Sequence, residues 1–284
     1  MDFMKWMFVV IFCCVSVGCI RTGVRPRTAE LSRHKAVRLD YTLAPSTRAD
    51  STISYRKNGS PDMQQKMGDS GWRERPSLPA FLSGFLFFNG AISFGYGLKE
   101  WLELQVELGV QEQGLGVRMA LLNERLWSSP FSLAASARAS YRPFEDVTQI
   151  GGQLGFDLSK SFDRGHVFTP FINVYATYGP ESYTLGFDEK CGGPGQSNCK
   201  VALGRPDQFF HIIRSELRLD MGFGAKIRVH KDRGFYLLAT FMPYIILWNR
   251  EPKKQVCIGC SGIQIDSFQQ NWGYHVAFTW GYDW

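Results

Sequence analysis

The chain has 284 residues and a formal net charge of +6; 44% of its residues are hydrophobic, 14% are aromatic and 29 are glycine. This length is enough for one large β domain or two small ones, and the aromatic and glycine content favours strands and turns over helices. Beyond residue 20 no uninterrupted apolar run reaches the ~20 residues that a membrane-spanning helix needs, so a mature chain in a membrane would have to cross it as strands.

The first residues have the three parts of a signal peptide, which we assign to residues 1–18. Lys5 supplies a weak positive start, and an apolar stretch over 6–17 is too short to span a bilayer. The stretch ends at Ser16-Val17-Gly18-Cys19, which resembles the lipobox of bacterial lipoproteins. The resemblance implies lipidation at Cys19 and, with Ile20 after it, release to the outer membrane. Ser16 departs from the leucine that the family prefers, and ordinary cleavage without a lipid is the alternative.

A basic segment follows the signal peptide, and we expect residues 19–35 to form a periplasmic linker that carries the lipid anchor. Its positive residues continue to the edge of the next region: Arg21, Arg25, Arg27, Arg33, Lys35 and Arg38. Such a segment can bind nucleic acid, anionic lipid or cell-wall polymer. The chain has no aromatic-interleaved basic groove and no zinc-finger spacing, and export would separate it from nucleic acid. We therefore expect no nucleic-acid partner.

Apolar and polar residues alternate with a period of two from residue 36 onward. In one segment Leu102, Leu104 and Val106 alternate with Glu103, Gln105 and Glu107. This pattern predicts strands with one apolar and one polar face. The predicted strands cover 36–43, 80–97, 101–110, 115–122, 131–142, 149–160, 167–178, 209–228, 234–247 and 270–284. Several of them reach the ~9–11 residues that a tilted strand needs to cross a membrane.

The connections between these strands alternate in length. All three long connections, 44–79, 179–208 and 248–269, fall at the same end of the strands, and the connections at the other end are short. Transmembrane barrels have short periplasmic turns and longer outer loops. We therefore predict that residues 36–284 form an all-β, antiparallel, up-and-down transmembrane β-barrel of about 10 strands, within a range of about 8–12. An even strand number places both termini on the periplasmic side.

The last strand carries alternating large apolar residues, Phe278, Trp280, Tyr282 and Trp284. This pattern resembles the C-terminal strand signature of bacterial outer-membrane β-barrel proteins, which their barrel-assembly machinery reads. The resemblance covers about residues 80–284 and implies insertion into the bacterial outer membrane, with outer-membrane lipid and the assembly machinery as partners. The alternative is an edge strand in a soluble barrel or a secreted sandwich.

Two features depart from the ten-strand pattern. Pro170 and Pro243 lie inside predicted strands. A proline has no backbone N–H to donate, and every strand of a closed barrel is paired on both sides, so we expect both prolines near strand ends or bulges. Asn89-Gly90 is a strong hairpin signal that would split 80–97 into two strands. With a further strand near 50–57, that reading gives about 12 strands.

The polar face of the predicted strands is heavily charged, and the two signs nearly balance. The clearest members are Glu103, Glu107, Arg138, Arg214, Glu216, Arg218 and Asp220. A barrel of about ten strands has an interior little wider than its own side chains, and paired long charges would fill it. The sequence therefore predicts a plugged or very narrow lumen with a lumen charge network, and no open diffusion pore.

Besides Cys19, four cysteines remain after the signal peptide: Cys191, Cys199, Cys257 and Cys260. They lie in two predicted outer loops, and in an oxidising compartment we expect disulfides, most simply the two local pairs. A four-cysteine zinc site is the alternative, and a redox pair is a weaker one because no thioredoxin-like context surrounds the cysteines. We expect no metal and no cofactor.

Three functional hypotheses follow. The first is a structural or binding barrel that presents disulfide-braced loops to a surface ligand or partner protein. The second is a narrow channel or transporter for small solutes. The third is a membrane-embedded hydrolase that uses His275 or His211 with a lumen acid. No serine or aspartate stands beside His166, His211 or His275 at a telling spacing, so we assign no catalytic residue and expect no enzyme.

Overall fold

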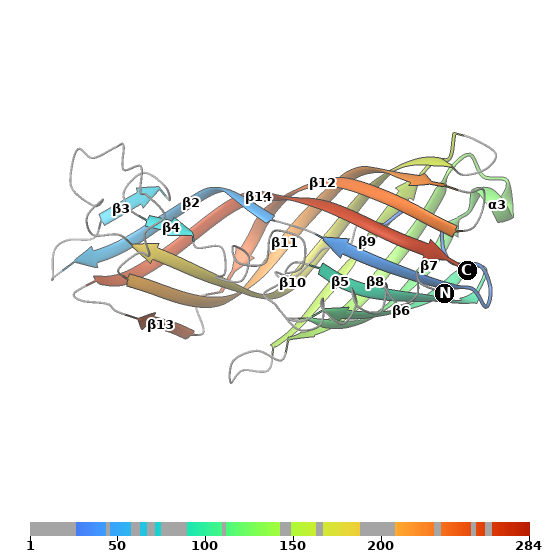
Figure 1. Cartoon of the computed structure of the whole chain (residues 1–284). Helices are drawn as coiled ribbons and strands as arrows, with labels where there is room; N and C mark the ends of the chain where they lie inside the picture. The colour runs from blue at the N-terminus through green and yellow to red at the C-terminus, as the bar shows by residue number, and fades with distance from the viewer. Residues whose placement is uncertain are drawn as a thin grey trace, which may run out of the picture.

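The computed structural model describes residues 27–43, 46–57, 63–66, 72–74, 90–109, 112–142, 149–162, 167–187, 208–229, 234–250, 254–258 and 263–284. These residues form a closed antiparallel β-barrel of ten strands (Figure 1). The ring runs in the order β1 (Val37–Leu43), β5 (Gly90–Lys99), β6 (Leu102–Gly109), β7 (Gln113–Leu122), β8 (Ser132–Arg142), β9 (Gln149–Ser159), β10 (Phe168–Phe187), β11 (Gln208–Arg228), β12 (Gly234–Asn249) and β14 (Ile263–Asp283). Pairing of β1 with β14 closes it.

The predicted fold class is confirmed, and most strand bounds differ by only a few residues. β5 begins at Gly90; residues 80–89, and with them the predicted turn at Asn89-Gly90, lie outside the described part. The predicted long connections contain further strands. β2 (Ser46–Lys57) takes over from β1 beside β14, β3 (Met63–Lys66) pairs with β2, β4 (Trp72–Glu74) pairs with β10, and β13 (Lys254–Ile258) pairs with β11. A short helix, α3 (Glu124–Trp127), joins β7 to β8.

Both prolines lie where the hydrogen-bond ladder is interrupted. Pro170 pairs with Ala225 of β11, but the ladder to β9 begins only at Phe171. Pro243 lies in a gap of the β11–β12 ladder, between the pairs Asp220↔Tyr244 and Phe223↔Phe241. A proline has no backbone N–H, so these interruptions accommodate it without losing a ladder bond.

The two ends of the barrel differ. β5 to β9 have 8 to 11 residues, whereas β10, β11 and β14 have 20 or 21. The strand rise of ~3.3 Å per residue makes the long strands ~30 Å longer than the short ones. β2, β10, β11 and β14 therefore project beyond the rim of the short strands, toward the left in Figure 1. We call this end the loop end, and the opposite end, where the short connections and the C-terminus lie, the turn end.

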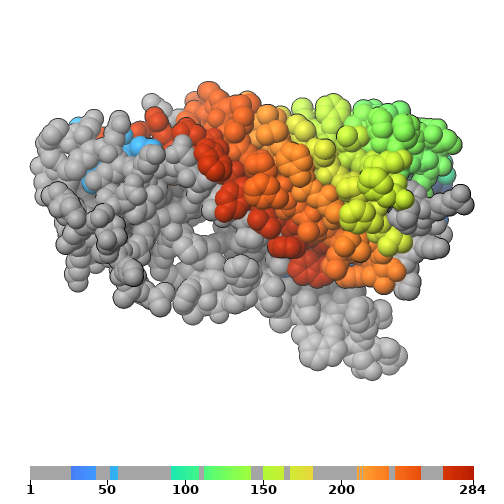
Figure 2. Space-filling view, turned by 90° about the horizontal axis from the view of Figure 1, so that it is seen from above, coloured from blue at the N-terminus to red at the C-terminus, as the bar shows by residue number. Residues whose placement is uncertain are grey.

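The barrel is apolar outside and polar inside. Strand β7 shows the alternation clearly: Leu115 is 61% exposed, whereas Arg118 is 1% exposed. Large apolar residues also face outward on the neighbouring strands, and Figure 2 shows the outer face of the C-terminal and central strands as a continuous wall. This arrangement reverses that of a soluble protein and is the architecture of outer-membrane β-barrels. No helix among the described residues is long and apolar enough to cross a membrane.

The segment 27–33 lies inside the lumen, and we call it the plug. Arg27 reaches Ser93 and Glu107 on the wall, whereas Arg33 lies against Gly97, near the turn end of β5. The plug therefore runs from the middle of the lumen toward the turn end before the chain turns into β1. We expected residues 19–35 to form a linker outside the barrel, and for the described part, 27–35, the observed path is different. Charged wall residues bind this segment, and periodicity arguments do not detect such contacts.

Candidate functional site

The lumen holds nearly all the buried charge of the described residues, so we treat it as the candidate site. Alternate residues of each strand point inward, which brings side chains from all parts of the chain into one narrow space. The buried charges are satisfied by one another, as burial in a low-dielectric interior requires. The lumen contains a central, a basal and an upper cluster.

The central cluster is organised around Glu103 of β6, which is fully buried. Its carboxylate lies 2.5 Å from Arg38, 3.4 Å from Arg118 and 3.8 Å from Arg27 of the plug. It also accepts hydrogen bonds from the side chain of Gln105 and from the backbone N–H of Ser32, each at 2.6 Å. One carboxylate therefore joins three wall strands to the plug.

A second buried carboxylate, Asp157 of β9, extends the central cluster. It pairs with Arg118 at 3.0 Å and accepts hydrogen bonds from Asn173 at 2.8 Å and from the hydroxyl of Tyr175. Arg118 and Asn173 also donate to the plug, to the backbone carbonyls of Thr28 and Arg27 respectively. The wall thus binds the plug backbone directly.

The basal cluster lies at the turn end and is organised around Glu30 of the plug. Lys226 of β11 lies 3.1 Å from this carboxylate, and Arg228 lies 3.9 Å from it. Arg228 also pairs with Asp283 of β14 at 2.6 Å. The hydroxyl of Ser161 donates to Glu30 at 3.4 Å. The plug therefore completes the charge balance of this end of the wall.

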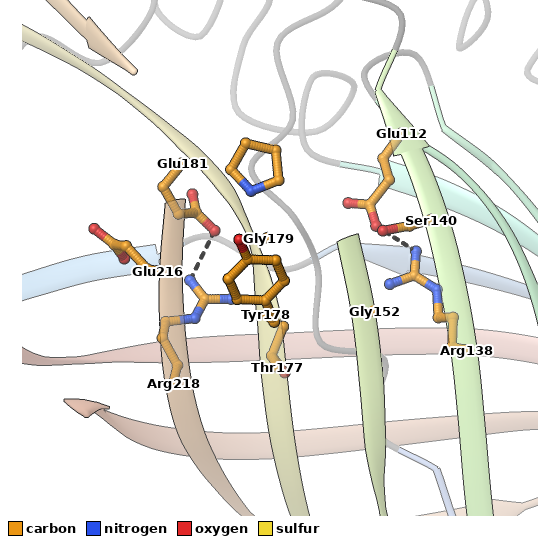
Figure 3. Close-up of a pocket in the computed structure, with 11 residues that line it drawn as sticks. Glu112, Arg138, Ser140, Gly152, Thr177, Tyr178, Gly179, Glu181, Glu216 and Arg218 are labelled. Carbon is orange, nitrogen blue, oxygen red and sulfur yellow. Dashed lines mark hydrogen bonds and ion pairs between the residues drawn. The ribbon is translucent and has the colours of Figure 1, made fainter. Parts of the chain in front are cut away.

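The upper cluster lies nearer the loop end, and Figure 3 shows part of it, with the pairs of Arg138 with Glu112 and of Arg218 with Glu181. On one side Arg138 pairs with Glu107 at 2.6 Å and Glu112 at 2.8 Å. On the other side Arg218 pairs with Glu181 at 2.9 Å, and Arg214 pairs with Glu216 at 2.5 Å. The hydroxyl of Thr177 donates to Asp220 at 2.7 Å.

Gly152 and Gly179 separate the two halves of the upper cluster (Figure 3). The cavity between them has a volume of about 10 Å³, and a second cavity at the basal end has about 20 Å³. Each is about the size of one water molecule. Neither cavity can hold an organic ligand as it stands.

The predicted network residues all lie in the lumen, but they do not form one cluster. Glu103 belongs to the central cluster, and Glu107 joins the plug to the upper one. The other five, Arg138, Arg214, Glu216, Arg218 and Asp220, lie in the upper cluster. The prediction missed the plug residues Arg27 and Glu30. It also missed Glu112, which lies outside any strand.

His275 is buried on the inner face of β14, where its ring stacks on Tyr244 with 4.8 Å between centroids. Tyr244 in turn lies beneath the guanidinium of Arg218, 5.2 Å away. His275 is therefore part of an aromatic stack at the upper cluster. The side chain of His211 and all of His166 lie outside the described part.

The cysteines of the predicted lipid and disulfide sites fall outside the residues and side chains that the structure describes. Cys19, Cys191, Cys199 and Cys260 lie outside the described residues, and Cys257 lies in β13 with a side chain that is not described. Among the described residues no group of three or more His, Cys, Asp or Glu side chains is placed to hold a metal ion.

Of the predicted insertion residues, Phe278, Trp280 and Tyr282 lie on the outer face of β14, and Trp284 directly follows this strand. Phe278, Tyr282 and Trp284 are each about half exposed, and Trp280 meets Tyr41 edge to face at 5.4 Å between centroids. Phe278, Trp280 and Tyr282 belong to the apolar outer surface of the barrel, and Trp284 also lines the cavity at the basal end of the lumen.

No protein-family model matches the chain, and no curated protein matches it in sequence. Several solved structures match in fold. Ail, the attachment invasion locus protein of Yersinia pestis, is 10% identical, with 88% of this chain and 97% of that one covered and a TM-score of 0.28. The outer membrane protease OmpT from Escherichia coli is 10% identical, with 88% and 97% covered and a TM-score of 0.38. The outer membrane protein OprG from Pseudomonas aeruginosa is 12% identical, with 91% and 99% covered and a TM-score of 0.32.

Proposed function

We propose that the protein is a non-conducting outer-membrane β-barrel that anchors a binding platform, formed by its projecting strands, at the cell surface. The observation that carries this proposal is the plug. Segment 27–33 fills the lumen from its middle to the turn end. It is held there by the side chains of Glu103, Arg118, Asn173, Lys226 and Arg228. A barrel with this interior serves better as an anchor than as a passage.

The energy needed to clear the lumen supports a closed state. Removing the plug would take Arg27 from Glu103 and Glu107, and Glu30 from Lys226. Breaking one buried ion pair typically costs about 3–5 kcal/mol, because a charge is left without its partner. Two such sites, together with the hydrogen bonds to the plug backbone, would keep the open state rare.

The same proposal includes a lipid anchor, disulfides near the projecting strands and a surface that binds a ligand or partner protein. A lipid on Cys19 would add a second membrane anchor; its support is the lipobox-like sequence. From Cys19 to Arg27 the chain can extend over at most ~29 Å, so the lipid must lie near a mouth of the barrel. Disulfides among Cys191, Cys199, Cys257 and Cys260 would brace the segments around the projecting strands, where a surface ligand or partner protein would bind.

Conductance in a planar bilayer tests the proposal. The purified protein is reconstituted alongside a general porin as a positive control. We expect no steady conductance of porin size, together with heat-modifiable migration on a gel that confirms a folded barrel. A stable open channel in the folded protein would contradict the proposal.

A narrow channel is the second candidate function. The observation that favours it is that the plug is held in the lumen by hydrogen bonds and ion pairs and is joined to the wall where the chain enters β1, so that it could be displaced. The behaviour of the wild type separates the two functions. A regulated channel predicts solute-dependent openings in the wild type, whereas an anchor predicts a closed wild type under all conditions. The double variant Arg27→Ala, Glu30→Ala should open in either case and shows that an opening would be detected.

A further inference from the structure

The plug gives the chain a direction inside the lumen. Its last residue, Arg33, lies against Gly97 at the turn end. Its first residue, Arg27, donates to Ser93 and pairs with Glu107. Ser93 is the fourth residue of β5 counted from the loop end, and Glu107 lies two residues before the loop-end terminus of β6. Followed back toward the N-terminus, the chain therefore rises from the turn end into the loop half of the lumen.

The turn end is closed around the plug. Glu30 pairs with Lys226 and accepts a hydrogen bond from Ser161, and the backbone N–H of Ala29 donates to the hydroxyl of Ser159. The cavity beside these residues has a volume of about 20 Å³ and holds one water molecule. An extended chain needs far more room, because it lies ~4.7 Å from one neighbour and ~10 Å from the next layer. The basal cavity therefore gives no room for a second pass of the chain.

Small side chains line the lumen on the loop-end side of Arg27. Ala91 of β5, Thr42 of β1 and Thr279 of β14 are register partners and form one row across three neighbouring strands. This row lies one inward-facing step beyond Ser93, toward the loop end. Although the three side chains are small, each is at most 3% exposed, so the lumen is filled at this level.

We propose that the segment 19–26 fills this space, so that the mature chain enters the lumen from the loop end and its N-terminus lies at the outer surface. From Ser93 to the start of β5 the wall rises by only three residues, or ~10 Å. From Cys19 to Arg27 the chain can extend over at most ~29 Å, so Cys19 can pass the rim of the short strands. A lipid on Cys19 would then enter the outer leaflet of the membrane.

This location of the N-terminus rests on the proposed function in one respect, which is that the plug closes the lumen. The C-terminus lies at the turn end, as the even strand number predicts (Figure 1). The N-terminus would lie at the opposite end, because the plug carries the chain back through the lumen before β1 begins. The N-terminal segment, with Arg21 and Arg25, would then stand beside the projecting strands at the cell surface.

Cysteine labelling in intact cells tests this location. The full chain with Thr22→Cys is expressed in a bacterial outer membrane and treated with a maleimide that does not cross the membrane. Mass spectrometry identifies the labelled residue, so the other cysteines do not interfere. Gln269→Cys, exposed on the projecting part of β14, is the control for the outer surface, and Lys99→Cys, exposed at the turn end, is the control for the inner side.

We expect Thr22→Cys to be labelled in intact cells as fully as Gln269→Cys, whereas Lys99→Cys should be labelled only after the cells are permeabilised. Labelling of Thr22→Cys that requires permeabilised cells would place the N-terminus at the turn end and overturn the proposal. Failure to label it under both conditions would also overturn it, because a surface-exposed segment must react.

A cross-link inside the lumen gives a second readout. Val24 lies at most ~11 Å along the chain from Arg27. In the variant carrying Val24→Cys and Ala91→Cys, a short bifunctional maleimide should join the two residues. The matched control combines Val24→Cys with Ser159→Cys, which is equally buried but lies at the turn end, and should stay uncrosslinked. A cross-link to Ser159→Cys in place of Ala91→Cys would overturn the proposal. A barrel that conducts in a bilayer could still pass both tests, so failure of this proposal and failure of the proposed function can be told apart.

Discussion

The lower part of the lumen, with the central and basal clusters, and the upper part, with the upper cluster, neutralise their buried charges in different ways. In the upper part, Arg218 pairs with Glu181 on the neighbouring strand, and Arg214 pairs with Glu216 on its own strand. In the lower part, wall residues depend on the plug: Lys226 pairs with Glu30, and Glu103 binds both Arg27 and the backbone of Ser32. The lower wall is therefore completed by the plug, whereas Arg214 and Arg218 of the upper wall are paired by residues of the wall itself.

The largest expected effect is at Glu103, where wall and plug meet. Glu103→Gln removes the shared counter-charge of Arg27, Arg38 and Arg118, and we expect a loss of about 3–5 kcal/mol in the free energy of unfolding. Urea unfolding in detergent measures it. Glu216→Gln is the matched control: Glu216 is about equally buried, but its ion pair is with Arg214 on the same strand and involves no plug residue, so its loss should be smaller than that of Glu103→Gln. Equal losses would contradict the distinction between the two parts.

A backbone clash can displace the plug without changing any charge. A Cβ added at Gly97 would lie 1.9 Å from the carbonyl oxygen of Arg33, whereas one at Gly152 would meet its nearest atom at 3.4 Å. We expect Gly97→Ala to push the plug from the turn end, which limited proteolysis of the N-terminal segment would detect as faster cleavage. Gly152→Ala should behave like the wild type. Unchanged cleavage in Gly97→Ala would place the plug elsewhere.

Removing the plug carboxylate should have a moderate effect. Glu30→Gln leaves Lys226 and Arg228 with Asp283 alone, and we expect a loss of about 1–3 kcal/mol in unfolding free energy. Brief conductance events should also appear in planar bilayers. Glu181→Gln in the upper cluster should lower stability without such events. If Glu30→Gln and Glu181→Gln opened equally often, the plug would not be the element that closes the lumen.

The smallest effect is expected at His275. Its ring stacks on Tyr244 in the upper cluster, away from the plug, and an aromatic pair contributes about 0.5–1.5 kcal/mol beyond its buried area. His275→Ala should therefore leave the plug and the closed lumen unchanged, with a stability loss no larger than about 2 kcal/mol. Loss of a lipid- or peptide-hydrolysing activity in this variant would instead support the hydrolase hypothesis.

The barrel was predictable because lipid and lumen impose opposite chemistry on alternate residues. Leu102 to Val106 show the pattern directly, and it marks β6 to β9 almost to the residue. Where strands leave the membrane, that constraint ends. β10 therefore continues past the predicted end at residue 178 to Phe187. β2 lies inside the predicted connection 44–79, where only the twelve-strand alternative placed a strand, near 50–57.

The lumen was predictable only in composition. Inward parity identified Glu103 and Arg218 as lumen residues, but not which charges pair, because the pairing depends on strand tilt and register. The plug has no periodicity of its own: its backbone is bound by wall side chains such as Arg118 and Asn173.

Cross-linking of the plug to the wall tests the central claim most directly. A Cβ added at Gly95 would lie 3.5 Å from the hydroxyl oxygen of Ser32, which is within reach of a disulfide. In intact membranes, the variant carrying Ser32→Cys and Gly95→Cys should form this cross-link nearly completely, as read by mass spectrometry, whereas each single variant should not. If the double variant stays uncrosslinked in a folded barrel under oxidising conditions, the segment does not occupy the lumen and the account is wrong.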